Sequence, residues 1–326
     1  MPANLTQQYK KAEERYKAAG TDEERLTALE EMLREIPKHK GTEHLQGDLK
    51  KRRSKLKAAI EGGGKKSGGV KHVDVFHIPK SGAGQVALVG TPNCGKSAIL
   101  GALTHAHVHV ADFPFATDKP VPGMALFEDV SIQLVDAPPI TADFAPAGLV
   151  NTYRAADLLA IVIDLAGEVL EQMEVCTAYL DSHKLILDEG GDTHLARKTF
   201  VIATKADIAP AGTLETLKEL TDRPFEYLEI SSETKAGLDG LMQRIFEMLD
   251  VVRVYAKKPH EEADMKEPFT LKRGSNVHDL AYHIHRELAD KLKSARAWNS
   301  PNVHDGQNVQ REHVLSDKEI IELHFG

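Results

Sequence analysis

The stretch VALVGTPNCGKSAIL, residues 86–100, decides the fold class of this chain. Its centre, Gly90 to Ser97, matches the pattern G-x-x-x-x-G-K-[ST], and it lies between a strand-like apolar run and the start of a helix. Glycines let successive backbone N–H groups turn inward at a helix N-terminus and form an anion site. Lys96 can reach the β- and γ-phosphates of a nucleotide, and the Ser97 hydroxyl can ligate Mg²⁺. We therefore predict that this loop holds nucleotide phosphates.

Short apolar runs around this loop predict the strands of one sheet. They are rich in β-branched residues and alternate with helical stretches, the last of which is Leu238 to Leu249. Such runs are typical of a mostly parallel sheet with helices on both faces. The runs lie at residues 86–89, 132–135, 158–165, 200–203 and 227–230. We therefore predict an α/β domain over residues 84–250.

The flanking segments have different patterns. Residues 1–61 are expected to be helical, with one helix over Asp22 to Glu35 and another that begins with Thr42 as its N-cap. Residues 62–83 are expected to be a linker and lead-in, because EGGGKKSGG at 61–69 is rich in glycine. Residues 251–326 predict a small α+β domain with one helix over Val277 to Lys293. Its expected strands lie within residues 252–257, 267–274, 294–298 and 318–325.

The composition favours an intracellular protein. Two cysteines in 326 residues cannot form a disulfide framework, which fits a reducing compartment. The N-terminal residues have no apolar signal region, and no run approaches the roughly 18 apolar residues of a membrane helix. We expect a cytoplasmic protein with no membrane segment.

Charge is distributed unevenly along the chain. The net charge is −8, yet residues 37–66 contain ten Lys or Arg and three acids. This basic run, densest at Lys50 to Lys57, is either a solvated helix face or a contact for RNA phosphates.

Further patterns follow the phosphate loop in a fixed order. Thr117 lies in ADFPFATDKP, Asp136 ends SIQLVD, TKAD ends at Asp207, and Ser231 begins SSE. In this order the sequence resembles the GTPase fold. The resemblance implies that Thr117 ligates Mg²⁺ when the γ-phosphate is present and that Asp136 holds the metal through water. It also implies that the Asp207 carboxylate accepts the N1–H and amino group of guanine, a donor pair that adenine lacks.

The resemblance narrows to the Obg superfamily and to the developmentally regulated GTP-binding (DRG) proteins. Ile36 to Lys57 is similar to their N-terminal helical signature, and Val254 to Leu315 contains motifs of their C-terminal TGS domain, a β-grasp module. These motifs include Val254-Tyr255, FTLKRG at 269–274 and LKSAR at 292–296. The resemblance covers nearly the whole chain, and it favours contact with RNA or the ribosome through the basic helix and the TGS domain.

When the functional residues of the family are placed on the matching positions of this chain, the resemblance implies a GTP/GDP site. The candidate catalytic residues are Lys96, Thr117 and Asn93, and the candidate magnesium ligands are Ser97, Thr117 and Asp136. The nucleotide-binding set is Thr91, Pro92, Asn93, Cys94, Gly95, Lys96, Ser97, Ala98, Thr204, Lys205, Asp207, Ser231, Ser232 and Glu233.

The chain departs from the family pattern at the third GTPase motif. The usual D-x-P-G is Asp136-Ala-Pro-Pro139 here, and proline lacks the backbone N–H that glycine donates to the γ-phosphate. Ile140 stands where Ras-like enzymes place a water-orienting glutamine. Some relatives use a K⁺ ion for hydrolysis, held partly by an asparagine of the P-loop, and Asn93 occupies that position here. The alternative interpretation is that Asn93 only stabilises the turn of the loop. Other departures are ITADFAPAG at 140–148, Ala98 in place of threonine, and a segment at 171–198 that is too short for the helical insertion of eukaryotic DRG proteins.

Two functions remain open at this point. One is a slow GTPase, supported by Lys96, Ser97, Thr117 and Asp136; the other is a GTP/GDP-sensing scaffold with negligible turnover, favoured by Pro139. An ATPase is disfavoured by Asp207. Metal binding by the histidines at 105, 107 and 109, or a reactive thiol at Cys94, is less favoured than a passive role for these side chains.

Overall fold

The computed structural model describes residues 7–18, 22–36, 43–61, 75–104, 119–186, 196–259 and 261–325. Thr42, most of the glycine-rich linker, the histidines at 105–109 and Thr117 lie outside these residues. The chain divides into two compact units, Met1–Val73 and Asp74–Gly326. The four domain boundaries expected from the sequence stay a prediction.

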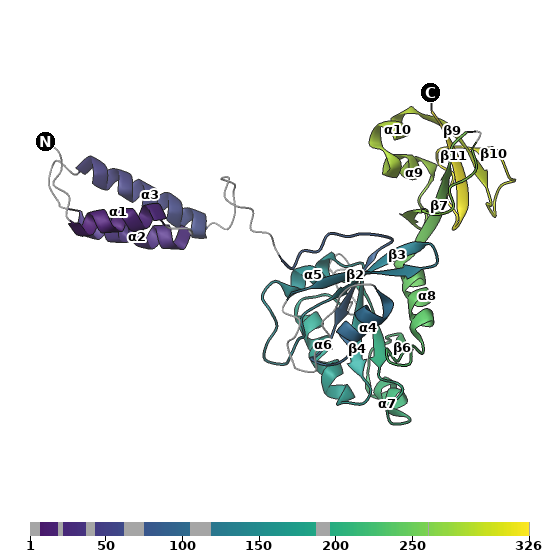
Figure 1. Cartoon of the computed structure of the whole chain (residues 1–326), viewed down its shortest axis with the longest axis horizontal. Helices are drawn as coiled ribbons and strands as arrows, with labels where there is room; N and C mark the ends of the chain where they lie inside the picture. The colour runs from purple at the N-terminus through teal and green to yellow at the C-terminus, as the bar shows by residue number, and fades with distance from the viewer. Residues whose placement is uncertain are drawn as a thin grey trace. The chain divides into compact units, whose positions relative to one another are not determined.

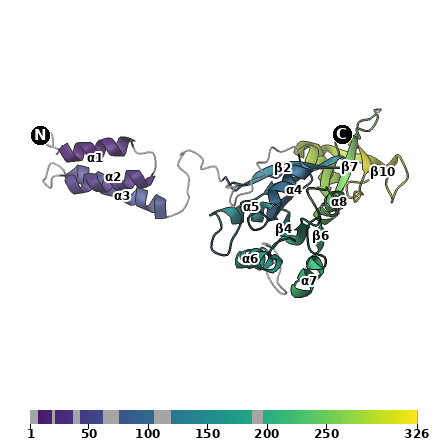
Figure 2. The ribbon, with the colours of Figure 1, turned by 60° about the horizontal axis from the view of Figure 1, so that its bottom comes forward.

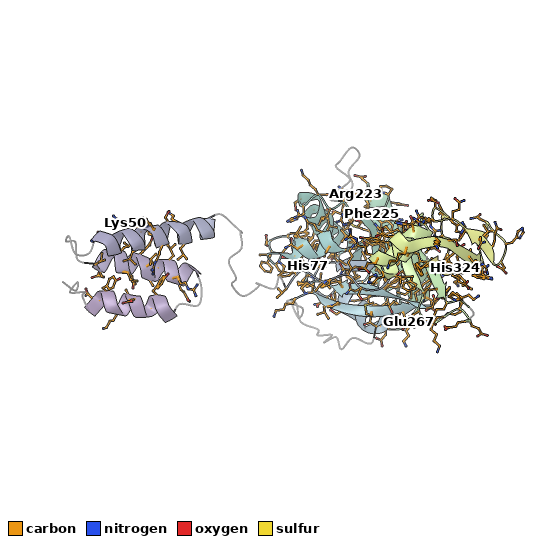
Figure 3. All side chains as sticks on the ribbon, turned by 90° about the horizontal axis from the view of Figure 1, so that it is seen from above. Lys50, His77, Arg223, Phe225, Glu267 and His324 are labelled. Atoms are coloured by element: carbon orange, nitrogen blue, oxygen red, sulfur yellow. The ribbon has the colours of Figure 1, made fainter. Side chains whose placement is uncertain are left out.

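The first unit is helical (Figure 1). It contains α1 Gln7–Ala18, α2 Asp22–Glu35 and α3 Glu43–Glu61, and α2 contacts both other helices. The three helices share a small core of Tyr9, Ala12, Leu29, Met32, Ile36 and Leu49. On α3 the side chains at 50–53 and Lys57 are exposed, and Figure 3 labels Lys50 among them.

The second unit begins with a six-stranded sheet in the order β2-β3-β1-β4-β5-β6. Every neighbouring pair is parallel except β2 and β3, which form an antiparallel hairpin. The strands are β1 Gln85–Val89, β2 Val121–Phe127, β3 Val130–Asp136, β4 Leu158–Asp164, β5 Lys198–Thr204 and β6 Tyr227–Glu229. The mostly parallel sheet expected from the apolar runs is confirmed.

Helices cover both faces of this sheet (Figures 1 and 2). Val86 and Leu88 of β1 pack in one core with α4 Lys96–Leu103 and α8 Leu238–Leu249. The alternate residues Ala87 and Val89 pack in a second core with α5 Leu149–Ala155 and α6 Val169–Ser182. A last helix, α7 Thr213–Leu220, buries Leu214 and Leu217. Because β1 is buried on both faces, its C-terminal end is a rigid base for the phosphate loop.

A second sheet, in the order β10-β9-β11-β7-β8, forms the C-terminal domain. Its strands are β7 Val251–Lys257, β8 Phe269–Lys272, β9 Leu292–Trp298, β10 Gln307–Val309 and β11 Glu319–Phe325. Strands β7 and β11 are parallel, and the other pairs are antiparallel. The α9 residues Val277, Leu280 and Ala281 share one core with this sheet, so the expected α+β domain is confirmed.

The single helix expected over Val277 to Lys293 is wrong. The structure has α9 Val277–Ile284 and α10 Arg286–Lys291, separated by His285 in an extended conformation. The His285 Nδ1 atom accepts the Glu287 backbone N–H at 3.3 Å and so caps α10. Leu292 and Lys293 belong to β9. Apolar periodicity continues across the break, which is why the sequence pattern did not reveal it.

One residue connects the last helix of the first domain in the second unit to the first strand of the C-terminal sheet. Helix α8 ends at Leu249 and strand β7 begins at Val251, so Asp250 alone separates them. Asp250 has a left-handed conformation, with φ 53°. Its carbonyl accepts the Arg273 N–H at 2.8 Å, and its carboxylate Oδ1 accepts from Arg273 Nε at 2.8 Å. The connection between α8 and β7 is therefore short, and Arg273 holds it through two hydrogen bonds.

Candidate functional site

The phosphate loop connects β1 to α4. Gly95, the N-cap of α4, has φ 100°, and Asn93 has φ 60°. A Cβ on Gly90 would lie 2.5 Å from Cys94 Sγ and 2.9 Å from the Val162 carbonyl oxygen. Glycine at 90 and 95 is thus required by close approach and by backbone conformation, respectively.

Lys96 is buried inside this loop. Its side-chain Nζ donates to the carbonyls of Gly90 at 3.0 Å and Thr91 at 2.8 Å, and it lies 3.6 Å from Cys94 Sγ. The ammonium has three N–H donors, so it can donate to a phosphate oxygen while it keeps both carbonyls. The neighbouring side chains Thr91, Pro92 and Ala98 are half-buried, and Asn93 is exposed.

Ser97 and Asp136 meet at the end of the sheet. Ser97 Oγ donates to Asp136 Oδ2 at 2.5 Å, and Asp136 is fully buried where β3 lies beside β1. A hydroxyl and a carboxylate are oxygen ligands of the kind Mg²⁺ prefers, so this pair fits the ion. Among the described residues no group of three or more His, Cys, Asp or Glu could hold a metal. Within the described residues this pair is the candidate protein contribution, and phosphate oxygens and water would supply further ligands.

The candidate base-reading residues lie on two neighbouring loops. Thr204 Oγ1 donates to the Cys94 carbonyl at 2.8 Å, which ties the TKAD turn to the phosphate loop. The Ala206 N–H donates to the Ile230 carbonyl at 3.2 Å, which ties the same turn to the end of β6. Asp207 and Glu233 are exposed, Ser232 is half-buried, and Ser231 is buried. The structure thus brings the loops of the two motifs together.

Asp164 is a residue of this site that the sequence reasoning missed. It ends β4, and its Oδ2 lies 2.6 Å from Lys205 Nζ. Lys205 has φ 58°, so the ion pair also holds an unusual backbone conformation. A carboxylate at the C-terminal end of a buried parallel strand was a signal that could have identified it.

The segment after β3 packs against the phosphate loop. Pro139 and Ile140 are buried, and the Ile140 side chain packs in the core with Ala137, Leu149 and Tyr153. The Ile140 N–H donates to the Gly90 carbonyl at 3.2 Å. The Ile140 side chain is both apolar and fully buried, so it cannot orient a water molecule.

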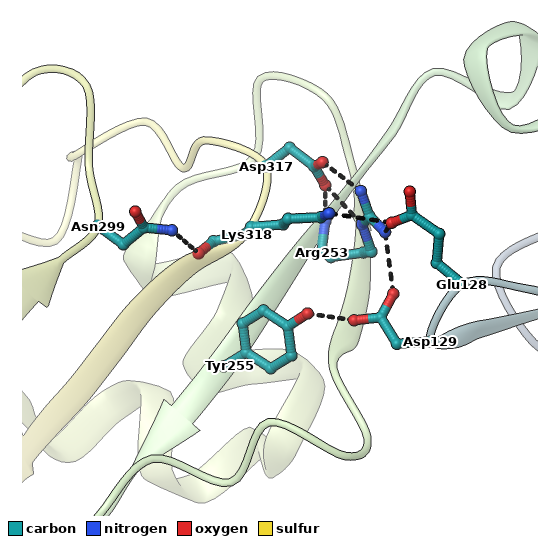
Figure 4. Close-up of polar contacts among 7 residues, drawn as sticks. All are labelled: Glu128, Asp129, Arg253, Tyr255, Asn299, Asp317 and Lys318. Atoms are coloured by element: carbon teal, nitrogen blue, oxygen red, sulfur yellow. Dashed lines mark hydrogen bonds and ion pairs between the residues drawn. The ribbon is translucent and has the colours of Figure 1, made fainter. Parts of the chain in front are cut away.

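A second polar cluster joins the β2–β3 turn to the C-terminal domain (Figure 4). Arg253, at 4% exposure, binds Asp317 through two hydrogen bonds of 2.7 and 3.0 Å, and Asp129 at 2.9 Å. It also contacts Glu128 and lies 4.8 Å from the centre of the Phe246 ring. We call this cluster the hairpin latch; it consists of Glu128, Asp129, Arg253, Tyr255, Asp317 and Lys318.

The latch holds its carboxylates in the charged form. Burial alone would raise the pKa of Asp129, but hydrogen bonds from Tyr255 and Arg253 outweigh it, so the pKa is lowered. The pKa of Asp317 is also lowered, because bonds from Arg253 outweigh the effect of burial. Burial and the bond to Asp129 raise the pKa of Tyr255 to about 12. The turn residue Glu128 has φ 51°, in a two-residue turn where Asn-Gly is favoured. Glu128 is therefore explained by its contacts with Arg253 and Lys318 of the C-terminal domain, and not by a preference for this turn.

Comparison with known proteins identifies both domains. Residues 85–189 match the family described as 50S ribosome-binding GTPase, and residues 252–324 match the TGS domain. The chain therefore contains a domain of this GTPase family, followed by a C-terminal TGS domain.

Along nearly its whole length the chain is similar to developmentally regulated GTP-binding proteins. It is 27% identical to developmentally-regulated G-protein 3 of Arabidopsis thaliana and 27% identical to GTP-binding protein 1 of Schizosaccharomyces pombe; each match covers 92% of this chain and 98% of the relative. An uncharacterized GTP-binding protein of Methanocaldococcus jannaschii is 26% identical, with 92% of both chains covered. Among solved structures, the G domain of the T. maritima FeoB iron transporter matches 50% of this chain and 97% of its own, with 24% identity and a TM-score of 0.37.

The described part of the chain contains no helix that is both long and apolar enough to cross a membrane.

Proposed function

We propose that this protein binds GTP and GDP with Mg²⁺ and hydrolyses GTP slowly. The observation that carries the proposal is the Ser97–Asp136 contact of 2.5 Å beside the buried ammonium of Lys96. Lys96 would neutralise the β- and γ-phosphates, and the N–H groups at the start of α4 would bind them along the helix axis. Ser97 and Asp136, with Thr117 outside the described residues, would hold magnesium, which supplies charge neutralisation of the phosphates.

Guanine selectivity is assigned to Asp207. Its exposed carboxylate follows a turn that Thr204 fastens to the phosphate loop, so a bound base and its phosphates would share one rigid support. Lys205 would lie along the base, with its ammonium fixed by Asp164. Ser231, Ser232 and Glu233 would line the other side of the base.

Slow turnover follows from the side chains near the γ-phosphate position. Ile140 is buried, so no side chain at that position orients the attacking water. Asn93 is exposed in the phosphate loop, and we propose that it helps to hold K⁺ there. Equal turnover in matched KCl and NaCl would exclude the potassium part of the proposal.

Contact with RNA or the ribosome is assigned to α3 and the TGS domain. The α3 side chains at 50–53 are exposed cations, and consecutive exposed cations attract a phosphate backbone. The cytoplasmic location expected from the sequence stays a prediction.

A second candidate function is a nucleotide-sensing scaffold with negligible hydrolysis. Pro139 favours it, because it removes the N–H that would otherwise bind the γ-phosphate.

Two measurements separate these functions. Competition of GTP, GDP and ATP for the full chain, with Lys96→Ala and Asp207→Asn as paired variants, tests the site. Single-turnover phosphate release from bound GTP tests the enzyme. The GTPase proposal requires release that the Lys96 variant lacks; binding without release supports the scaffold, and preference for ATP contradicts both.

A further inference from the structure

A glutamine side chain takes the place of a neighbouring strand at the end of β4. Strand β1 pairs with β4 as far as Val89, which lies opposite Ile161, whereas β4 continues to Asp164. Beyond Ile161 the β1 side of β4 therefore needs other partners for its backbone groups. The side-chain amide of Gln172, on α6, supplies them at Asp164. Its Oε1 accepts the Asp164 N–H at 2.9 Å, and its Nε2 donates to the Asp164 carbonyl at 3.1 Å.

These two bonds act on the backbone of a residue whose side chain belongs to the candidate base site. The Asp164 carboxylate accepts the Ala166 N–H through Oδ1 at 2.9 Å, and its Oδ2 lies 2.6 Å from Lys205 Nζ. The Asp164 carbonyl also accepts the Gly167 N–H at 3.2 Å. Loss of the Gln172 amide would therefore leave the Asp164 N–H as the group without a protein partner, and the strand end would be held on one side only.

The amide of Gln172 and the carboxylate of Asp164 lie close together beside Gly167. A Cβ at Gly167 would lie 3.1 Å from Gln172 Nε2 and 3.6 Å from Asp164 Oδ2. The backbone of Gly167 does not have a positive φ, so only the lack of a side chain matters here. A methyl group at this position would press on the amide first.

The position of the Lys205 ammonium depends on Asp164. The Lys205 side chain is 39% exposed, and a lysine loses much rotamer freedom when a ligand fixes it. The ion pair with Asp164 restricts the side chain before any base is bound, which lowers the entropy cost of binding. An Asp164 that moves with a loose strand end would not have this effect.

We propose that Gln172 is a positioning residue of the base site, which acts through Asp164 to hold the Lys205 ammonium in place before a guanine nucleotide binds. This inference rests on the proposed nucleotide site and adds to it a residue of α6 that lies outside every sequence motif of that site. Gln172 contributes to affinity through the order of Lys205 and not through a contact with the nucleotide.

The test measures GDP affinity of the full chain with Mg²⁺ by calorimetry, and thermal unfolding checks that each variant folds. Gln172→Met keeps the length of the side chain and removes both hydrogen bonds. Gln243→Met is the matched control, because Gln243 is an exposed glutamine of another helix, α8. Lys205→Met removes the ammonium and keeps the apolar stem, and the double variant with Gln172→Met completes a cycle.

Gln172→Met is expected to weaken GDP by about fivefold, because binding must then order Lys205. Gln243→Met should leave the affinity unchanged. In the Lys205→Met background Gln172→Met should weaken GDP by less than about twofold, since no ammonium remains to be positioned. A glutamine that only supports the fold would instead lower the unfolding midpoint without changing affinity, or would give the same loss of affinity in both backgrounds. Either result would overturn the inference.

A second pair of variants decides if Gln172→Met does not fold. Gly167→Ala places a methyl group against Gln172 Nε2 and is expected to weaken GDP by about threefold. Gly240→Ala is its control, because a Cβ at Gly240 would meet no atom within 4 Å. Equal affinities for these two variants would overturn the inference. An unaltered chain that does not bind GDP would contradict the proposed function itself, whereas every other negative result leaves that function intact.

Discussion

Replacing Arg253 by methionine would remove the centre of the hairpin latch while keeping most of the buried apolar volume. The guanidinium side chain is 5% exposed, and it contacts carboxylates of Asp317 and Asp129 that are 31% and 22% exposed. The substitution leaves these acids beside each other without their shared cation. Because they remain near the surface of the cluster, water can partly replace the arginine.

The size of the effect follows from these exposures. Removing one partner of a buried ion pair costs about 3–5 kcal/mol, and the partial exposure of the acids favours the lower end, about 3 kcal/mol. Asp317 contributes the largest part of this free energy, because it accepts two side-chain hydrogen bonds from Arg253, at 2.7 and 3.0 Å. A cycle that combines Arg253→Met with Asp317→Asn should therefore give a coupling of about 2 kcal/mol.

Trp298 provides the assay. It is the only tryptophan of the chain, and it ends β9 of the TGS sheet, so its emission follows the unfolding of that domain. Urea unfolding at neutral pH should give a lower midpoint for Arg253→Met than for the unaltered chain. Arg244→Met is the matched control, because its ion pairs to Glu226 and Glu247 lie at the surface, and it should shift the midpoint far less. A loss below about 1 kcal/mol for Arg253→Met, or additive effects in the cycle, would refute the assignment of the latch.

Four further outcomes are expected. Lys96→Ala should weaken GTP and GDP by about 100-fold in calorimetry, since it removes charge-assisted bonds to phosphate. Asp207→Asn should reduce the preference for guanine over adenine nucleotides by about 100-fold in competition, and an unchanged preference would contradict its role. The pKa values of the latch carboxylates Asp129 and Asp317 lie below the ordinary value of 3.8 for aspartate, so these groups stabilise the fold fully above that pH. The stability measured by Trp298 emission should therefore fall as the pH drops below 3.8, and it should fall much less in Arg253→Met. Replacing the four cations at residues 50–53 by alanine should lower the salt dependence of RNA binding by a slope of about 3, and an unchanged slope would exclude α3 as the contact.

The sequence predicted the strands that are buried on both faces, because such strands appear as continuous apolar runs. It did not predict β2, whose residues VPGMALF contain proline and glycine. Proline is tolerated there because β2 is an edge strand of the sheet. The bounds of α8, Leu238 to Leu249, were predicted from the sequence because its apolar stripe is strong and its ends are marked by Gly237 and Asp250.

The candidate site also has parts that a local sequence pattern predicts and parts that it does not. Gly90 to Ser97 is a local pattern with a physical reason for its glycines and lysine, so the sequence alone was enough to predict a phosphate site there. The hairpin latch has no local pattern, because its acids and Arg253 come from segments more than 60 residues apart. The Ile140 contact is made by a backbone amide, which no side-chain motif can reveal. Both required the three-dimensional arrangement.

The junction at Asp250 has a mechanical consequence. A helix that passes into a strand through one residue leaves little room for bending, and here Arg273, directly after β8, binds that residue. We therefore expect a tilt of α8 to be passed on to β7, because no flexible linker lies between them to absorb it. The TGS sheet is accordingly expected to follow movements of α8 in the nucleotide domain.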